Sequence, residues 1–358
     1  MSGPFTGKIR IGIPFGVGKG CTVVREPLGS GRRALGQLAT TDPASSQPST
    51  VGMAWVAGGS FLMGSQDFYP EERPVRRVEV DGFWMDDHPV TVAEFRRFTS
   101  ATGYVTLAER PLDPAQYPGA DPALLQPGAL VFHTTKGPVD LRDYTQWWRY
   151  IPGAQWRRPH GPGSTTQGMG EHPVTQVAAE DAEAYAAWAG KDLPTEAEWE
   201  FAARGGLDGA VFTWGDDFAP GGTMMANTWQ GEFPWQNLKT DGWEGTSPVK
   251  SFPPNGYGLY DMAGNVWEWT SDYFIARQGA QVQHSCCTPR NPHVTSAEAS
   301  LAPGEPGAHI PRRVTKGGSH LCAPNYCLRY RPAARQPQAI DTATCHLGFR
   351  CVLRDASS

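Results

Sequence analysis

The sequence predicts one α+β domain that is irregular, loop-rich and low in regular secondary structure. Its 42 glycines and 32 prolines make up about a fifth of the 358 residues, where average usage gives roughly an eighth. The 13 tryptophans and 11 tyrosines are too many for a disordered chain and indicate a fold held together by aromatic side chains. Three segments have helical apolar spacing, and no interdomain linker is visible between residues 53 and 354.

Residues 52–354 are expected to form this domain. Residues 1–51 contain few aromatic side chains and end in the polar run TTDPASSQPST, which predicts a flexible N-terminal extension, and residues 355–358 form a short tail. No stretch of about 18 apolar residues and no apolar secretion signal is found. The net charge of −5 mixes both signs and favours neither nucleic acid nor a membrane as partner. We therefore expect a cytoplasmic protein.

Short strands are predicted at the start of the domain. The segments 53–65, MAWVAGGSFLMGS, and 75–86, VRRVEVDGFWMD, are rich in β-branched and aromatic residues and are divided by glycine turns. In the second segment, polar and apolar side chains alternate, which is the pattern of a half-buried strand.

A helix with clear end signals follows these strands. Thr91 is the predicted N-cap, Glu94 is its capping-box partner, and Gly103 is the predicted stop. Phe95 and Phe98 share one face, so we expect them in the core.

Two more helices are predicted in AAEDAEAYAAWAG, which ends at Gly190, and in PTEAEWEFAARGG. The second helix has its own capping box, formed by Thr195 and Glu198. Beyond residue 206 no long helical period is visible, and turns divide short segments. The side chains expected to pack in the core from these two helices are Ala182, Tyr185, Trp188, Trp199 and Ala202.

Seven cysteines indicate reduced thiols rather than a disulfide framework. Their number is odd and no secretion signal accompanies them, as expected in a reducing compartment. The four within one 30-residue stretch near the C-terminus suggest a site, and they are Cys322, Cys327, Cys345 and Cys351.

Cys322 and Cys327 are five residues apart, which would direct their side chains apart in a helix and to opposite faces of a strand. Pro324 also disfavours regular structure, so converging thiols would need a loop. Two thiolates form a soft site that selects Cu(I). Three arginines that would lower the thiol pKa if they fold nearby are Arg329, Arg331 and Arg335.

Other chemistry remains open for this cysteine pair. A structural zinc site could recruit Cys345, His346 or Cys351, although two closely spaced ligand pairs would be the normal pattern. A disulfide conflicts with a reducing compartment. A thioredoxin-type redox pair would need a Cys-x-x-Cys motif in a βαβ setting.

The carboxylates of Asp261 and Glu268, with Gly264 between them, could close a calcium-binding loop, because calcium takes oxygen ligands that glycine turns expose. The spacing is not that of an EF-hand. Acids that cap local backbone amides would explain this segment as well.

An ordered series of motifs resembles the formylglycine-generating enzymes, also called sulfatase-modifying factors. The resemblance spans about residues 53–353 and implies their C-type-lectin-like fold. Gly-Asn-Val-Trp-Glu-Trp alone marks the wider superfamily, whereas the cysteine pair marks its catalytic branch. The motifs are GGSFLMGS, LPTEAEWEFAARGG, NTWQGEFP, NGYGLYDMAGNVWEWTSD, KGGSHLCAPNYCLRYRPAAR and LGFRC.

The resemblance implies a copper-dependent oxidase that activates sulfatases. Such enzymes use O2 to convert a cysteine in a Cys-x-Pro-x-Arg segment of an unfolded or nascent sulfatase into Cα-formylglycine, and an external thiol reductant supplies electrons. Cys322 and Cys327 would hold Cu(I) as a dithiolate. The alternative, from another class, is a catalytically silent relative that binds peptides in its aromatic pocket without copper.

Pocket residues follow from the same resemblance. Ser319 corresponds to a hydroxyl that orients O2 or water, although closing the Gly317–Gly318 turn explains it equally well. His346 replaces an asparagine of some relatives. For the substrate arginine, we expect an acid in the segment ERPLDP. The residues expected to contact substrate are Trp267, Tyr326, His346 and Asp113.

Two structural calcium sites are also implied. The first would use Asn227, Asp241 and the carbonyls of Thr228 and Trp243. The second would use Asp261, Glu268 and the carbonyls of Gly264 and Val266.

The sequence departs from secretory-pathway members of the family at two positions. Ala203 and Pro332 stand where those members carry structural cysteines, which leaves Cys351 without a disulfide partner and supports the cytoplasmic prediction. Cys286 and Cys287 are adjacent and have no assigned role. Free thiols and a second metal contact both remain open for them.

Overall fold

A computed structural model describes residues 49–117, 122, 125–276, 288–304 and 307–354. Most of the predicted N-terminal extension and the 355–358 tail lie outside these residues, as do Cys286 and Cys287. None of the helices in the described ranges is long and apolar enough to cross a membrane.

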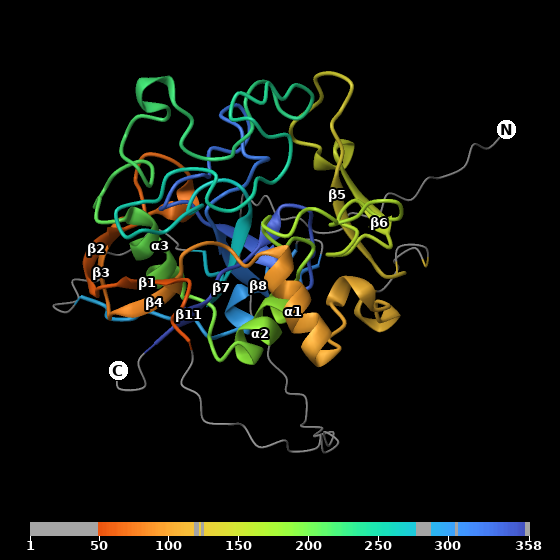
Figure 1. The fold of residues 1–358 in the computed structure, drawn as a ribbon, viewed down its shortest axis with the longest axis horizontal. Coiled ribbons are helices and arrows are strands. Elements are labelled where there is room, and N and C mark those ends of the chain that lie inside the picture. Colours follow the sequence, from red (N-terminus) through yellow and green to blue (C-terminus); the bar gives the residue numbers. More distant parts are fainter. Residues whose placement is uncertain (1–48, 118–121, 123–124, 277–287, 305–306, 355–358) are drawn as a thin grey trace, which may run out of the picture.

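Short strands and few helices form the fold, with long irregular segments between them (Figure 1). The strands are β1 (Met53–Val56), β2 (Gly59–Met63), β3 (Arg76–Val80), β4 (Phe83–Asp86), β5 (Gly128–Phe132), β6 (Trp148–Pro152), β7 (Trp267–Tyr273), β8 (Arg312–Lys316), β9 (Gln336–Ala339), β10 (Leu347–Gly348) and β11 (Val352–Leu353). The α-helices are α1 (Val92–Thr102), α2 (Ala179–Trp188) and α3 (Glu196–Arg204). Short 3-10 helices are η1 (Pro70–Glu72), η2 (Leu107–Glu109), η3 (Pro114–Gln116), η5 (Tyr144–Gln146), η6 (Pro220–Gly222) and η7 (Glu298–Ser300).

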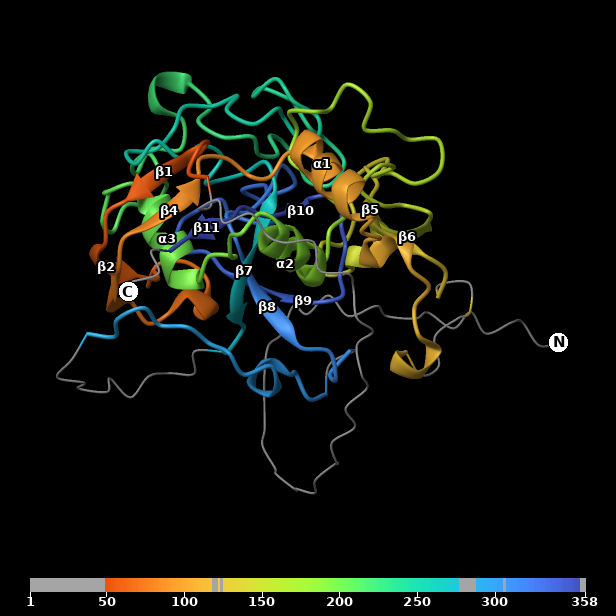
Figure 2. The same ribbon diagram turned by 60° about the horizontal axis from the view of Figure 1, so that its bottom comes forward.

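The strands pair into four small sheets. A four-stranded sheet has the order β10-β7-β8-β9, with β10 parallel to β7 and the other pairs antiparallel (Figure 2). A three-stranded sheet has the order β1-β4-β11, and β2 pairs with β3. The β5–β6 hairpin lies at the opposite side of the molecule from the β2–β3 pair.

The predicted helix caps are confirmed. Thr91 and Glu94 form a capping box at the start of α1, and Gly103 ends that helix in the left-handed conformation. Thr195 and Glu198 form the corresponding box on α3. Local hydrogen bonds between a cap side chain and a nearby amide decide these ends, so sequence spacing suffices to place them.

Aromatic residues fill the main core, which is shared by α1, α2 and the cysteine loop. Phe95 of α1 lies 6.0 Å from the ring of Tyr185 on α2 and 5.3 Å from that of Trp156. Cys322 and Cys327 belong to this same buried cluster. The prediction that Trp188 is a core residue is wrong: its side chain is 43% exposed, because it follows the last buried turn of α2 and covers Phe98 and Tyr185 from outside.

Helix α3 joins two cores, since it packs against β2, β3, β7 and β8. All nine of its residues are buried, including the charged Glu196, Glu200 and Arg204. The sequence analysis did not predict strands β7, β8 and β9, which flank the site described next.

Candidate active site

The cysteine loop, residues 317–335, connects the neighbouring antiparallel strands β8 and β9. Gly318 has a φ of +70°, and a Cβ on it would meet the Tyr330 amide nitrogen at 2.8 Å, so the loop needs glycine where it leaves β8. The Cys322 amide donates to the Ser319 carbonyl (2.9 Å) and the Cys327 amide to the Ala323 carbonyl (2.7 Å). These two turns bring the cysteines back toward each other.

The Sγ atoms of Cys322 and Cys327 lie 2.9 Å apart and are buried, with side chains 2% and 7% exposed. Both are free cysteines, because a disulfide would hold the sulfurs about 2.05 Å apart. The pair lies on a loop, as the spacing predicts. It presents two soft sulfur ligands to one point.

The environment of the two thiols differs. The pKa of Cys327 is lowered because its sulfur accepts a hydrogen bond from Cys322 and lies near the Arg329 guanidinium, whose Nη1 is 4.0 Å away. Burial and the hydrogen bond to Cys327 raise the pKa of Cys322 well above its usual value. Without a metal, these surroundings favour ionisation of Cys327 over ionisation of Cys322.

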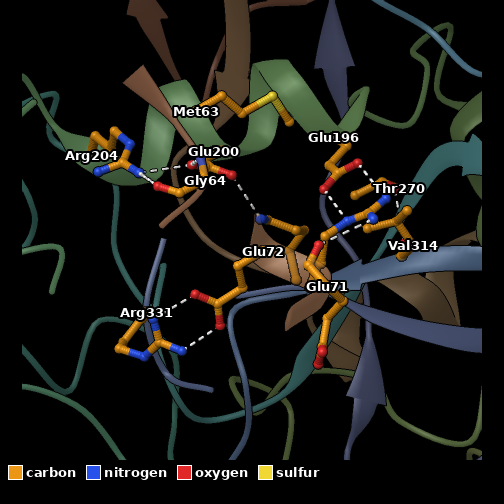
Figure 3. A network of polar contacts seen from close by, with 12 residues as sticks. Met63, Gly64, Glu71, Glu72, Glu196, Glu200, Arg204, Thr270, Val314 and Arg331 are labelled. Carbon is orange, nitrogen blue, oxygen red and sulfur yellow. Dashed lines mark hydrogen bonds and ion pairs between the residues drawn. The ribbon is translucent and has the colours of Figure 1, made fainter. Parts of the chain in front are cut away.

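Of the three arginines after Cys327, Arg329 alone contacts a thiol among the described residues. Arg331 instead makes a two-pronged ion pair with the fully buried Glu72, and Arg335 pairs with Glu196 at 2.6 Å. Figure 3 shows the Glu72–Arg331 pair beside the Glu200 and Glu196 contacts. The condition that the arginines fold near the thiols is met by Arg329, whereas buried carboxylates from distant segments neutralise Arg331 and Arg335.

A cavity of about 50 Å³ borders both cysteines, with room for a few water-sized molecules. Aromatic rings line it, with Tyr326 stacked 4.5 Å from Phe233. Trp267 and Trp148 also face it, so the predicted walls Trp267 and Tyr326 lie where the sequence analysis expects them. A larger cavity of about 560 Å³, between the end of α2 and the start of α3, does not include the cysteines.

Ser319 and His346 supply polar atoms to this small cavity. The Ser319 hydroxyl is fully buried and accepts the Leu321 amide at 3.2 Å, so it closes the turn and lines the cavity at once. His346 Nδ1 lies 2.6 Å from the Thr344 hydroxyl. Burial, with a smaller contribution from His320, lowers the pKa of His346 to about 3, which keeps its imidazole neutral.

The structure does not bring Asp113 to this cavity. It is exposed, and its carboxylate accepts the Ala115 amide at 3.0 Å as the N-cap of η3. A four-ligand zinc site is not formed either: within the described ranges, no group of three or more His, Cys, Asp or Glu side chains is placed to hold a metal. Cys345 accepts the Phe132 amide, and Cys351 is buried as a free thiol, as the missing partner position predicts.

The first implied calcium set gathers around Asp241. Its Oδ2 accepts the Thr228 amide (3.1 Å) and the Gln230 side-chain nitrogen (2.8 Å), and its Oδ1 accepts the Trp243 amide (2.9 Å). The Thr228 carbonyl meets the same Gln230 nitrogen. Asn227 is buried beside them and donates to the Gly245 carbonyl. The Thr228 carbonyl oxygen and Asp241 Oδ2 therefore converge on the Gln230 side-chain nitrogen. Such oxygens are the ligands that a hard cation takes.

The second implied set is more fully engaged. Glu268 Oε2 accepts Trp199 Nε1 (2.8 Å) and Arg350 Nε (2.7 Å), and Oε1 accepts Arg350 Nη2 (2.8 Å). A carboxylate has about four acceptor positions, so one remains on Oε1. Asp261 already accepts the Lys250 amide at 2.8 Å. The Arg350 guanidinium thus supplies most of the positive charge here, a contact that no local sequence signal predicts.

Comparison with known proteins places this fold and dithiol site in one class. A family model described as "Sulfatase-modifying factor enzyme 1-like domain" matches residues 38–355, starting ahead of the predicted boundary at residue 52. The structure of PvdO from Pseudomonas aeruginosa matches with a TM-score of 0.55 and 24% identity over 84% of this chain and 93% of that chain, which shows the fold alone. The class is the irregular α+β fold of the formylglycine-generating enzymes and C-type-lectin-like domains, as predicted.

The names of similar proteins identify the family within this fold class. A formylglycine-generating enzyme from Mycobacterium tuberculosis is 56% identical over 295 residues, covering 82% of this chain and 95% of the relative. Another from Thermomonospora curvata is 43% identical, covering 86% and 95%. The chain belongs to the formylglycine-generating enzyme family, whose active members are oxidases that act on a protein cysteine. A bovine protein named inactive C-alpha-formylglycine-generating enzyme 2 is also 44% identical, covering 84% and 88%, so identity alone does not separate activity from its loss.

Proposed function

We propose that this chain converts a cysteine in a Cys-x-Pro-x-Arg segment of a sulfatase into Cα-formylglycine, with Cu(I) held by Cys322 and Cys327. The observation that carries the proposal is the buried pair of free thiols 2.9 Å apart beside an aromatic cavity. Soft thiolates select Cu(I) among the common metals. Bound copper would supply the one-electron chemistry that lets O2 react with the substrate.

The overall reaction consumes one O2 and two electrons. The substrate R–CH2–SH, O2, two protons and two electrons give R–CHO, H2S and H2O, and two external thiols supply the electrons as they join in a disulfide. The oxidised atom is the substrate Cβ: its bond to sulfur and one of its bonds to hydrogen break, and a C=O double bond forms. Because the electrons and O2 come from solution, two tasks remain for the protein: it binds the substrate, and it excludes bulk water from the reacting atoms.

Residues of this chain perform those tasks in the proposed reaction. The aromatic walls formed by Phe233, Trp267 and Tyr326 keep the cavity small, so that it admits a side-chain tip but not a folded surface. The Ser319 hydroxyl can donate a hydrogen bond to O2 or water in the cavity while it accepts the Leu321 amide. A neutral His346 can hydrogen-bond there without adding positive charge beside the sulfurs.

A direct test uses the reduced protein reconstituted with Cu(I) and a Cys-x-Pro-x-Arg peptide under O2 with dithiothreitol. We expect the peptide mass to fall by the replacement of the thiol with an aldehyde, and an aldehyde-specific reagent to label the product. A copper-loaded protein that binds the peptide but forms no aldehyde would support the peptide-binding alternative instead.

The Cys327→Ser variant tests the ligand assignment. It removes one of the two soft ligands, so tight Cu(I) binding and turnover should both be lost. Cys345→Ser is the matched control, because Cys345 is a buried free thiol outside the cavity lining. Full activity in Cys327→Ser would refute the dithiolate site.

Two further properties belong to the same proposal. Structural calcium would bind around Asp241, where side-chain and carbonyl oxygens converge. A cytoplasmic location remains a prediction, supported by four buried thiols that carry no disulfide in the described residues.

A further inference from the structure

The segment Phe68–Glu72, which we call the brace segment, lies between β2 and β3 and covers the chain just after Cys327. It contributes no residue to the cavity lining. Its contacts are nonetheless concentrated on residues 328–331, more than 250 positions away in the sequence.

Tyr69 holds the amide that follows Cys327. The Leu328 N–H donates to the Tyr69 hydroxyl at 3.0 Å, and the Arg329 guanidinium lies 3.8 Å above the Tyr69 ring. A peptide group is planar, so fixing the Leu328 N–H also fixes the plane that contains the Cys327 Cα. Tyr69 therefore limits the direction from which the Cys327 side chain leaves the backbone.

The brace segment also fixes the carbonyl group of Leu328, through Arg331. Arg331 Nε donates to the Leu328 carbonyl at 2.8 Å, and its terminal nitrogens pair with Glu72, one of them at 2.9 Å. The Arg331 guanidinium also stacks 3.6 Å from the Phe68 ring. Figure 3 shows the Glu72 carboxylate facing Arg331 in this buried network. Both peptide groups of Leu328 are thus anchored to the brace segment.

Cys322 is positioned by different elements. Its amide donates to Ser319 within the loop, and its carbonyl accepts the Trp229 amide at 3.0 Å. The separation of the two sulfurs consequently depends on two different supports: the Ser319 turn and Trp229 hold Cys322, and residues 68–72 hold the chain just after Cys327.

We propose that Tyr69 is a positioning residue for the copper ligand Cys327. It acts through the Leu328 amide and not through contact with substrate, and the inference rests on the proposed copper function. A soft-metal site with only two protein ligands depends on the placement of each, because a ligand shell must be oriented by its neighbours to bind well. Removing the hydroxyl while keeping the ring should loosen Cys327 without opening the core.

The test is the Cu(I) affinity of Tyr69→Phe, measured anaerobically by competition with a Cu(I)-selective chelator of known affinity. One lost backbone hydrogen bond predicts an affinity about tenfold weaker than that of the wild type. The control is Tyr150→Phe, which removes a tyrosine hydroxyl that donates to the Gln126 carbonyl at 2.6 Å; Tyr150 does not line the cavity. The control should keep wild-type copper affinity.

Thermal midpoints of both variants separate positioning from general destabilisation. We expect similar midpoints for the two variants and weaker copper binding for Tyr69→Phe alone. Equal Cu(I) affinity in Tyr69→Phe and wild type would overturn the inference while leaving the copper site intact, as would equal weakening in both variants. A wild-type protein that binds no Cu(I) would overturn the proposed function itself.

Discussion

Arg329 Nη1 lies 4.0 Å from Cys327 Sγ, while its Nη2 lies 2.7 Å from the Glu71 carboxylate. One guanidinium therefore links a thiolate to an acid from a distant segment. The positive charge lowers the pKa of Cys327, and Glu71 fixes where that charge sits.

Replacing Arg329 with methionine should raise the pKa of Cys327, because the thiolate loses its nearest positive charge. Iodoacetamide alkylation of Cys327 in the copper-free protein, followed by peptide mass spectrometry, should shift to higher pH by about one unit. Arg142→Met, on the surface, serves as the control. An alkylation curve that stays in place would contradict the role of Arg329.

The buried Glu72–Arg331 pair predicts a strong asymmetry between single and double variants. Glu72→Gln leaves the Arg331 guanidinium buried without its charge partner and should lower the free energy of unfolding by about 3–5 kcal/mol. The double variant Glu72→Gln/Arg331→Met should recover much of that loss, since no uncompensated charge remains. Urea unfolding at pH 7 measures both.

The exposed Asp140–Arg142 pair provides the control for that series. Its Arg142 side chain is 90% exposed, so Asp140→Asn should leave the urea midpoint unchanged. A Glu72→Gln protein as stable as the control would mean that water or rearrangement compensates the buried guanidinium.

Asp181 predicts a pH dependence of stability. Burial raises its pKa to about 6 although the amides of Leu107 and Ala178 and the hydroxyl of Tyr104 donate to it. The folded protein therefore binds a proton more tightly than the unfolded chain between about pH 4 and 6, and this contribution is lost as pH rises through that window. Its size is about 2–3 kcal/mol.

Asp181→Asn isolates this contribution, because asparagine does not titrate. Chemical denaturation at pH 4, 5, 6 and 7 should show that the variant loses less stability than wild type as pH rises from 4 to 6. Parallel stability curves would show that Asp181 has the same pKa in both states.

Calcium removal tests the oxygen cluster at Asp241. Excess EGTA should lower the thermal midpoint of the wild-type protein, because the Thr228 and Asp241 oxygens that converge there would lose a bound cation. Asp241→Asn should have a lower midpoint that EGTA no longer changes. An EGTA response that survives in this variant would place the calcium elsewhere.

Sequence reasoning worked where the governing interaction was local. The Thr91–Glu94 capping box depends on residues three positions apart, and the need for a loop between Cys322 and Cys327 follows from side-chain direction alone. Sequence reasoning did not predict the long-range partners. Nothing near Arg331 in the sequence indicates that it pairs with Glu72, and nothing near Leu328 indicates that its amide bonds to Tyr69.

In the candidate pocket, the residues assigned from motifs were predicted correctly as lining residues, and the residue assigned from charge was not. Trp267, Tyr326, Ser319 and His346 line the cavity as expected, because a family resemblance aligns them with known positions. Asp113 does not line the cavity; it was assigned to the substrate arginine because of its charge and not because of any motif. An exposed acid can cap a helix as readily as it can bind a ligand, and spacing alone does not distinguish the two.

The ion pairs around the cysteine loop also order events during folding. Lys316 bonds to Glu200, Arg335 to Glu196 and Arg331 to Glu72, at sequence separations of 116, 139 and 259 residues. Closing such long loops costs chain entropy that is recovered only when the contacts form, so these pairs assemble late. During synthesis, a chain that has not yet reached residue 335 lacks Arg335 and therefore its pair with Glu196. The turns within the cysteine loop are local, but the ion pairs that fix the position of the loop need the completed domain.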